Sequence, residues 1–234
     1  MTSELTAAAA DVERESAIGR SLFSFAIFYG GMVCIAGVLG NKQVSLGPLS
    51  AIGPVFGIGP LAVEAGIFAF LMLVITSSAI AELHGRATAN RLVLIGFVPL
   101  VASILLTLLV LKLPASSEMA ADRQSAFEMM MGATWRIWIA GIVAYGVSQF
   151  LNVTIFSWLK GKEGAQLLWL RSGIASVLSQ VVDTLLFITI AFHGVFPITN
   201  LLFGQMLAKV VLSVVLVPPL VYAFVALGRR LDRA

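Results

Sequence analysis

Two charged residues interrupt apolar stretches that are long enough to cross a membrane. Asp183 stands near the middle of Arg171–Phe192, and Lys209 lies within the apolar stretch that follows. A charged side chain at the bilayer centre costs about 2.5 to 3.5 kcal/mol on insertion scales and is a functional candidate by default. The chemistry open to such a pair is ion pairing, proton exchange and hydrogen bonding to a polar ligand.

Further polar residues share a helix face with each of these charges. On the first stretch they are Ser172, Ser176, Ser179 and Gln180, at i−11, i−7, i−4 and i−3 from Asp183. On the second stretch Gln205, Lys209 and Ser213 follow at i, i+4 and i+8. We expect Asp183 to pair with Lys209 across the bundle, which would relieve much of the desolvation cost of both. This pair either serves a substrate or proton site or only fixes helix packing.

The other candidates for substrate binding come from other segments. Gln149 and Asn152 are i, i+3 neighbours, for which hydrogen bonding between helices is as good an explanation as substrate contact. Glu64 falls in the first turn of a predicted helix, where the helix dipole favours a carboxylate. Asn41 either caps the end of a predicted helix or turns its amide toward the site. The predicted substrate-binding set is Asp183, Gln180, Lys209, Gln149, Asn41, Glu64, Asn152 and Gln205.

Composition indicates a membrane protein. Of the 234 residues, 59% are hydrophobic and only 12% are charged, against about 25% charged residues in soluble domains. The formal net charge of +3 does not indicate nucleic-acid binding, because the basic residues lie in short loops where membrane topology explains them. We expect a multi-pass protein in contact with lipid and without a nucleic-acid partner. Its oligomeric state stays open, with a homo-oligomer as one alternative.

Six segments have spanning length, which predicts an all-α, polytopic membrane protein. They are 21–39, 61–81, 91–113, 137–159, 172–192 and 198–227. Pro218-Pro219 predicts a kink or a break in the last segment. Residues 45–60 contain repeated Gly and Pro and are expected at the outer face, as a re-entrant segment or a surface loop.

The distribution of Lys and Arg places both termini in the cytoplasm. We therefore divide the chain into a cytosolic tail (1–18), a six-helix transmembrane domain (19–228) and a basic cytosolic C-terminus (229–234). The acidic tail does not fit a cleavable signal. Glu82 and Arg86 would form an i, i+4 pair if the second helix continues that far.

Known catalytic motifs are absent from the sequence, which contains no HExxH, P-loop or GxSxG. His84 and His193 are predicted at opposite faces of the membrane and Cys34 is the single cysteine, so we expect no metal and no disulfide. No serine has an evident histidine partner for acyl transfer. We predict a protein that is not an enzyme and that needs no cofactor.

These polar residues resemble the motifs of the queuosine precursor transporter family, also called the vitamin uptake transporter family. The segment SQVVDTLLFITIAF resembles the family pattern S-Q-x-x-D-T-x-x-F through Ser179, Gln180, Asp183, Thr184 and Phe187. Further matches are Arg171, Lys209, Gln149, Asn41-Lys42, and Glu82 with Gly85. The departures are Ser78 for an aspartate, His84 for a tyrosine, Asn152 for a position that is sometimes acidic, and Leu71 for a proline.

The resemblance implies a secondary transporter that imports 7-deazaguanine bases, precursors of the queuosine modification of tRNA, across the bacterial inner membrane. Such a purine-like base presents a ring N–H and an exocyclic amine side by side, which match a carboxylate. Asp183 is the first choice for that role and Glu64 the second, with Phe150, Trp158 and Phe187 as candidate aromatic walls.

The energy source is open. Alternating access with proton coupling is one alternative, and a substrate-binding subunit of an ATP-energised uptake system is another. The alternative functions other than transport are an intramembrane enzyme and a membrane scaffold.

Overall fold

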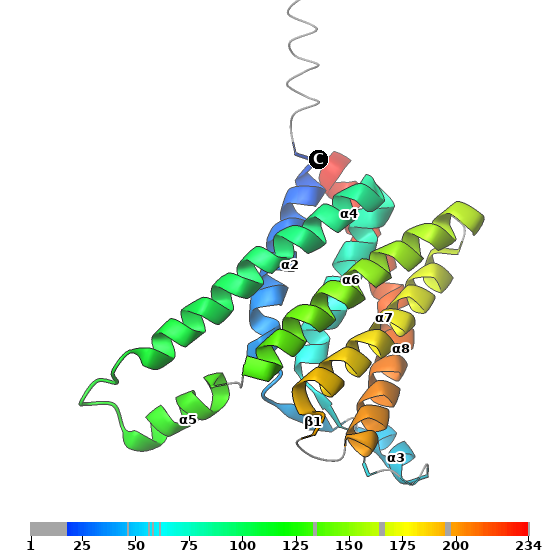
Figure 1. Cartoon of the computed structure of the whole chain (residues 1–234). Coiled ribbons are helices and arrows are strands. Elements are labelled where there is room, and N and C mark those ends of the chain that lie inside the picture. Colours follow the sequence, from blue (N-terminus) through cyan, green and yellow to red (C-terminus); the bar gives the residue numbers. More distant parts are fainter. Residues whose placement is uncertain are drawn as a thin grey trace, which may run out of the picture.

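The structure, a computed structural model, describes residues 18–233 except 46, 56, 58, 61, 133–134, 164–166 and 195–197. Within these residues, five helices have the length and composition of a membrane span. They are α2 (Arg20–Leu39), α4 (Gly66–Lys112), α6 (Trp135–Glu163), α7 (Leu168–Phe192) and α8 (Thr199–Arg233). Figure 1 shows them as one bundle. The helical, apolar architecture is that of a multi-pass membrane protein, and the predicted tail lies almost entirely outside the described residues.

One bent helix explains why the described residues form five helices of spanning length where the sequence predicts six segments. The second and third predicted segments form the single 47-residue helix α4, which is interrupted at Gly85 with φ 85° and ψ 163°. This conformation is essentially restricted to glycine. The arms, 66–84 and 86–112, turn back on each other (Figure 1). At 1.5 Å per residue they measure about 28 and 40 Å, against a hydrocarbon core of about 30 Å.

The first arm of α4 forms the centre of the bundle. α4 packs against α2, α6 and α8, while α7 packs between α6 and α8. Most residues between Ile67 and Ala81 are buried. The second arm instead leaves Leu94, Leu105 and Leu109 more than half exposed, as expected for side chains that face lipid. Polar side chains of the first arm must therefore find partners within the protein.

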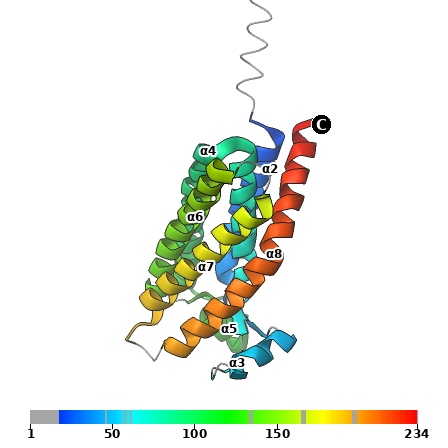
Figure 2. The same cartoon turned by 90° about the vertical axis from the view of Figure 1, so that its right-hand side faces the viewer.

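A short β-ribbon caps one end of the bundle. β1 (Gln43–Ser45) pairs antiparallel with β2 (Ala62–Glu64), which places Gln43 opposite Glu64. η1 (Gly47–Ala51) and α3 (Ile52–Val55) connect the strands, and Val55 is 80% exposed. Both views place this cap beyond the helices, at the end far from the C-terminus (Figures 1 and 2). The described residues between 45 and 60 thus form a surface cap. The second predicted segment starts at Gly66 because residues 62–64 belong to the ribbon.

The proline pair does not break the last helix. α8 runs without interruption from Thr199 to Arg233 with Pro218 and Pro219 inside it. Its lower and upper parts follow different directions in Figure 2. Of the two predicted outcomes, a kink or a break, the structure excludes the break.

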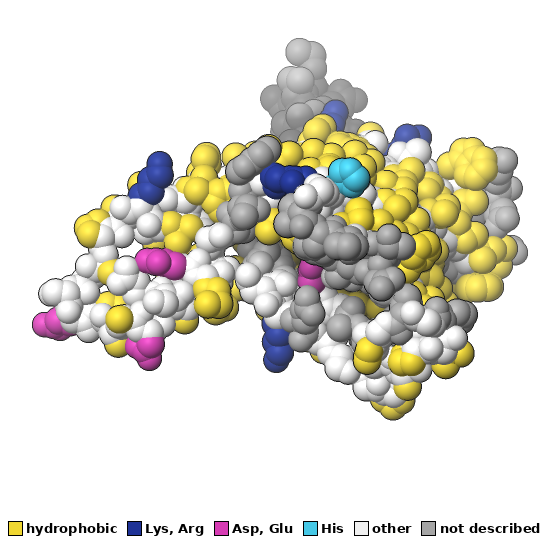
Figure 3. All heavy atoms as spheres, turned by 60° about the horizontal axis from the view of Figure 1, so that its bottom comes forward, with side chains coloured by type: hydrophobic (Ala, Val, Ile, Leu, Met, Phe, Trp, Pro, Cys, Tyr) yellow, Lys and Arg dark blue, Asp and Glu magenta, His cyan; other side chains and the backbone are white. Residues whose placement is uncertain are grey.

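The segment after α4 forms a lobe beside the bundle. α5 (Ala121–Met131) contains no buried residue and lies beyond the far end of the second arm of α4 (Figure 1). Figure 3, which brings the capped end forward, shows acidic side chains gathered on this lobe, while Lys and Arg side chains are scattered over the face. Asp122 and Glu128 of α5 are among the exposed residues.

The kink in α4 can be tested by giving Gly85 a side chain. Gly85→Ala should destabilise the protein by about 1 to 3 kcal/mol, because alanine is strained at this φ and ψ. Gly141→Ala is the matched control, since a Cβ at Gly141 on α6 meets no atom within 4 Å and alanine favours a helix. Thermal unfolding in detergent measures both variants. Equal or higher stability of Gly85→Ala would contradict this role of the glycine.

Candidate functional site

Asp183 and Lys209 meet inside the bundle, on α7 and α8. The ammonium Nζ of Lys209 lies 3.4 Å from Oδ2 of Asp183, and Ser148 Oγ on α6 donates to Oδ1 at 3.3 Å. Asp183 is 7% exposed and Lys209 is 6% exposed. Each charge relieves the desolvation cost of the other. Both contacts are longer than the 2.7–2.9 Å of a strong charge-assisted hydrogen bond.

A second polar group joins α6 to the first arm of α4. Gln149 Oε1 accepts from Ser77 Oγ at 3.3 Å, and Asn152 Nδ2 donates to Ser77 Oγ at 3.2 Å and to Ser78 Oγ at 3.1 Å. All four side chains are fully buried. Ser78 stands where the family resemblance leads us to expect an aspartate, and Asn152 stands at a position that is sometimes acidic. These two departures from the family pattern are in contact through a neutral hydrogen bond.

Two tyrosines complete this polar group and were not predicted from the sequence. Tyr29 Oη on α2 lies 3.0 Å from Tyr145 Oη on α6, and it is 3.5 Å from Gln149 Oε1. Tyr145 Oη also donates to the backbone oxygen of Val93 at 3.0 Å. A Cβ on Gly96 would collide with the Tyr145 hydroxyl, so only glycine allows this close approach. In the sequence, tyrosines within apolar segments are indistinguishable from packing residues.

Several buried polar atoms around these contacts have no hydrogen-bond partner among the described residues. Gln180, which is fully buried, lacks a partner for both its amide nitrogen and its amide oxygen. The others include Gln149 Nε2, Asn152 Oδ1, Gln205 Oε1, Ser176 Oγ, Thr184 Oγ1 and Ser213 Oγ. A buried polar group without a partner costs about 1 to 3 kcal/mol. Helices α6, α7 and α8 thus carry buried donors and acceptors that have no partner among the described residues.

Glu64 and Gln205 extend this set toward the β-ribbon. Gln205 Nε2 donates to Glu64 Oε1 at 3.3 Å, which links β2 to α8. Gln205 precedes Lys209 by four residues, about 6 Å or one turn of helix. Glu64 thus stands near the Asp183–Lys209 pair, on the side of the capped end, while Gln205 is 4% exposed.

Other predicted contacts lie away from the site. Asn41 is exposed, and its Nδ2 donates to Gly37 O and Val38 O, both at 3.2 Å, so it caps α2 as in the first of its two predicted roles. Trp158 is 56% exposed. Phe187 packs edge to face against Phe192 with ring centroids 6.2 Å apart.

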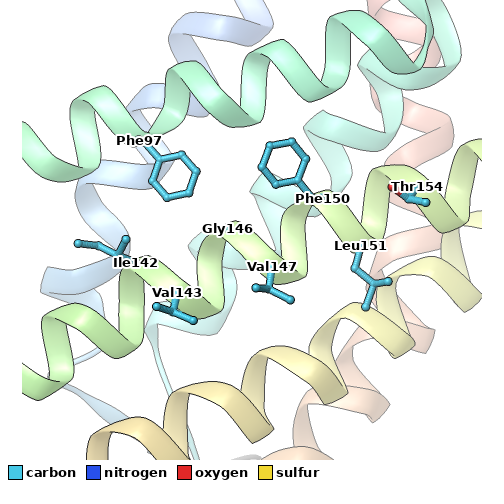
Figure 4. A pocket seen from close by; sticks show the side chains of 8 residues that line it. All are labelled: Phe97, Ile142, Val143, Gly146, Val147, Phe150, Leu151 and Thr154. Carbon is cyan, nitrogen blue, oxygen red and sulfur yellow. The ribbon is translucent and has the colours of Figure 1, made fainter.

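Phe150 lines a groove on the outer side of α6 rather than the polar site. The groove has a volume of about 660 Å³ and is bordered by Phe97, Ile142, Val143, Gly146, Val147, Phe150, Leu151 and Thr154. Figure 4 shows the Phe97 and Phe150 rings facing the space between the second arm of α4 and α6. The lining is apolar apart from Thr154, which suits lipid and not a hydrogen-bonding base.

The turn of α4 before Gly85 carries two further networks. Glu82 Oε2 lies 3.0 Å from Lys160 Nζ on α6 and 3.3 Å from Arg171 Nη1 on α7. The predicted Glu82–Arg86 pair is wrong, because the helix is interrupted at Gly85 between these residues. Arg86 Nη2 instead donates to Thr154 Oγ1 at 3.2 Å.

The second network ties the two ends of the described chain together. Ser21 Oγ on α2 lies 2.6 Å from His84 Nε2 and donates to Asp232 Oδ2 on α8 at 2.7 Å. Ser21 therefore has a histidine partner, contrary to the expectation from sequence. The arrangement is not that of a Ser-His-Asp triad, in which serine and carboxylate bind opposite ring nitrogens. Here the carboxylate, at 4.0 Å, approaches the same nitrogen as the serine.

Charged and amide side chains buried within apolar helices of spanning length are typical of membrane transporters. Comparison with known proteins narrows this class. Residues 64–224 match the family model described as "Putative vitamin uptake transporter". This protein belongs to the vitamin uptake transporter family. The matched range contains every predicted site residue except Asn41.

A curated relative carries a more specific description. A protein of Bacillus subtilis (strain 168), described as "Probable queuosine precursor transporter", is 32% identical over 155 residues. The match covers 62% of this chain and 63% of the relative, a little under two thirds of its length. No solved structure matches the chain. The resemblance to the queuosine precursor transporter family is thereby confirmed.

The Asp183–Lys209 contact predicts a strong energetic coupling. Asp183→Asn and Lys209→Met should each destabilise the protein by about 3 to 5 kcal/mol, because each leaves a buried charge without its partner. The double variant should lose less than the sum of the two. A double-mutant cycle of unfolding free energies in detergent measures the coupling, with exposed Lys42→Met as the control. Additive losses would show that the two charges do not interact.

Proposed function

We propose that this transporter imports 7-deazaguanine bases across the bacterial inner membrane by alternating access. The observation that carries the proposal is the unfilled polar set beside Asp183, and above all Gln180, whose buried amide has no partner for either atom. The description of the Bacillus subtilis relative supports the same substrate class.

The functional groups suit the edge of such a base. The two oxygens of Asp183 would accept the ring N–H and the exocyclic amine as parallel hydrogen bonds. The amide nitrogen of Gln180 offers a donor that complements the neighbouring carbonyl oxygen of the base. Lys209 and Ser148 hold the carboxylate in the present arrangement, so the substrate would replace them when it binds.

The arrangement of the chain ends supports six crossings with both termini on one side. Ser21 at the start of α2 is hydrogen-bonded to Asp232 at the end of α8, so an even number of crossings must separate them. Counting the two arms of α4 separately gives this even number. The Lys and Arg bias then assigns that side to the cytoplasm, in keeping with a transmembrane domain over 19–228.

The same end of the bundle is closed by the networks of Glu82 and His84. They connect α4 to α6 and α7 on one side and to α2 and α8 on the other. Release of a substrate to the cytoplasm would require these contacts to separate, as expected for the gate of an alternating-access carrier.

A cellular assay tests the substrate. The chain is expressed in a bacterium that lacks its own transporter and precursor synthesis, each 7-deazaguanine base is supplied, and queuosine in tRNA is measured. Gln180→Leu should reduce uptake about tenfold or more, as one or two lost hydrogen bonds to a buried ligand predict. Gln124→Leu, on exposed α5, should leave uptake unchanged. Absence of queuosine with every base would refute the proposed substrate class.

Proton coupling is tested in proteoliposomes that contain the purified protein alone. An inward proton gradient should accelerate uptake of labelled base, and Asp183→Asn should remove the acceleration, since an amide cannot exchange a proton between Lys209 and substrate. An uptake rate that is changed neither by the proton gradient nor by Asp183→Asn would exclude this coupling. Uptake that requires an added ATP-driven module would instead favour the role of a substrate-binding subunit, and chemical change of the base would indicate an enzyme.

A further inference from the structure

Arg171 has a hydrogen-bonding edge that the described residues leave empty. Its side chain is fully buried near the start of α7. Nη1 donates to Glu82 Oε2 at 3.3 Å, and the guanidinium carbon lies 5.1 Å from the centre of the Phe156 ring. The other two nitrogens, Nε and Nη2, have no hydrogen-bond partner within the described part of the chain. These two N–H groups point the same way from one edge of the planar guanidinium, and such a fork fits two oxygens of one anion.

The charges around Arg171 do not balance. Oε2 of Glu82 is the shared partner of Lys160 Nζ and Arg171 Nη1. Among the described side chains, no carboxylate other than Glu82 lies within 4.0 Å of Lys160 Nζ or the Arg171 guanidinium. Asp232 instead contacts Ser21 and His84, and Asp183 contacts Lys209. Among the described side chains the cluster therefore holds two cations and one carboxylate, and Arg171 is fully buried. An uncompensated buried charge is expensive, and this excess favours the binding of an anion.

The position of the cluster indicates where such an anion comes from. Lys160 is near the end of α6 and Arg171 is the fourth residue of α7, at the same end of the bundle as the C-terminus (Figure 1). A helix end of a spanning bundle lies at the depth of the lipid headgroups, and basic pockets between helices are known to bind their phosphates. The Lys160 side chain is 38% exposed, so an anion can approach from its side.

We propose that the Nε–Nη2 edge of Arg171, assisted by Lys160, binds a phosphate-type oxyanion. The phosphate of an anionic lipid headgroup and free inorganic phosphate share this chemistry. Two oxygens of the phosphate accept the two parallel N–H groups of the fork, and the ammonium of Lys160 supplies the second charge. The site is separate from the Asp183–Lys209 region and does not depend on which solute that region carries.

The test measures binding to the full chain in detergent. Inorganic phosphate is titrated by calorimetry, and dioctanoyl phosphatidylglycerol is compared with dioctanoyl phosphatidylcholine by native mass spectrometry. Arg171→Gln and Arg171→Lys are compared with Arg86→Gln, which removes a guanidinium bonded to the neutral Thr154. Arg171→Lys keeps the charge but lacks the fork, so it should bind about tenfold more weakly or worse, the value of one lost charge-assisted hydrogen bond. Arg86→Gln should bind like the unchanged protein.

Each outcome decides the proposal. Retention of phosphatidylglycerol alone assigns the site to a lipid headgroup, and binding of inorganic phosphate alone assigns it to the free ion. If neither binds, or if Arg171→Lys binds as tightly as Arg86→Gln does, the proposal is overturned. Base binding, measured in the same samples, should persist in Arg171→Lys. If Arg171→Gln does not fold, the comparison of Arg171→Lys with the unchanged protein still decides.

Discussion

The ion pair between Asp183 and Lys209 sets the conditions that the rest of the bundle must satisfy. Neither charge would be stable alone in the interior of the bundle, because the desolvation cost of a single buried ion exceeds what apolar packing around it returns. Their pairing requires α7 and α8 to run side by side in a fixed register, and Ser148 brings α6 to the same point. The polar atoms that remain unpaired around them then have no route to water except through a ligand or a conformational change.

Helix α4 supplies the second constraint, through a single glycine. Its first arm is the most enclosed helix of the bundle and contributes Ser77 and Ser78, whereas its second arm presents leucines outward. The change from one environment to the other takes place at Gly85, whose positive φ permits the reversal. The residues just before this turn make the contacts that close one end of the molecule.

The sequence identifies those candidate site residues that are charged or carry an amide within otherwise apolar segments. Asp183, Lys209 and Gln149 were identified because charges and amides are costly in apolar helices. Ser148 and Tyr145 were missed because hydroxyl-bearing residues are common in membrane helices and leave hydropathy almost unchanged. The burial of Arg171 was missed for a related reason, since an arginine at the end of a spanning segment normally extends toward water. The second and third predicted segments form one bent helix, which no residue pattern in the sequence indicated.

Glu82 and His84 are two residues apart and therefore point about 200° apart around α4. One turn of helix thus anchors α6 and α7 through one side chain and α2 and α8 through the other. The contacts of Glu82 and those of His84 depend on the same helical turn of α4, so a movement of this turn changes both sets together. The closed end of the bundle is consequently cooperative: displacement of this turn loosens both sets at once, and the energies of its contacts will not add when they are removed one at a time.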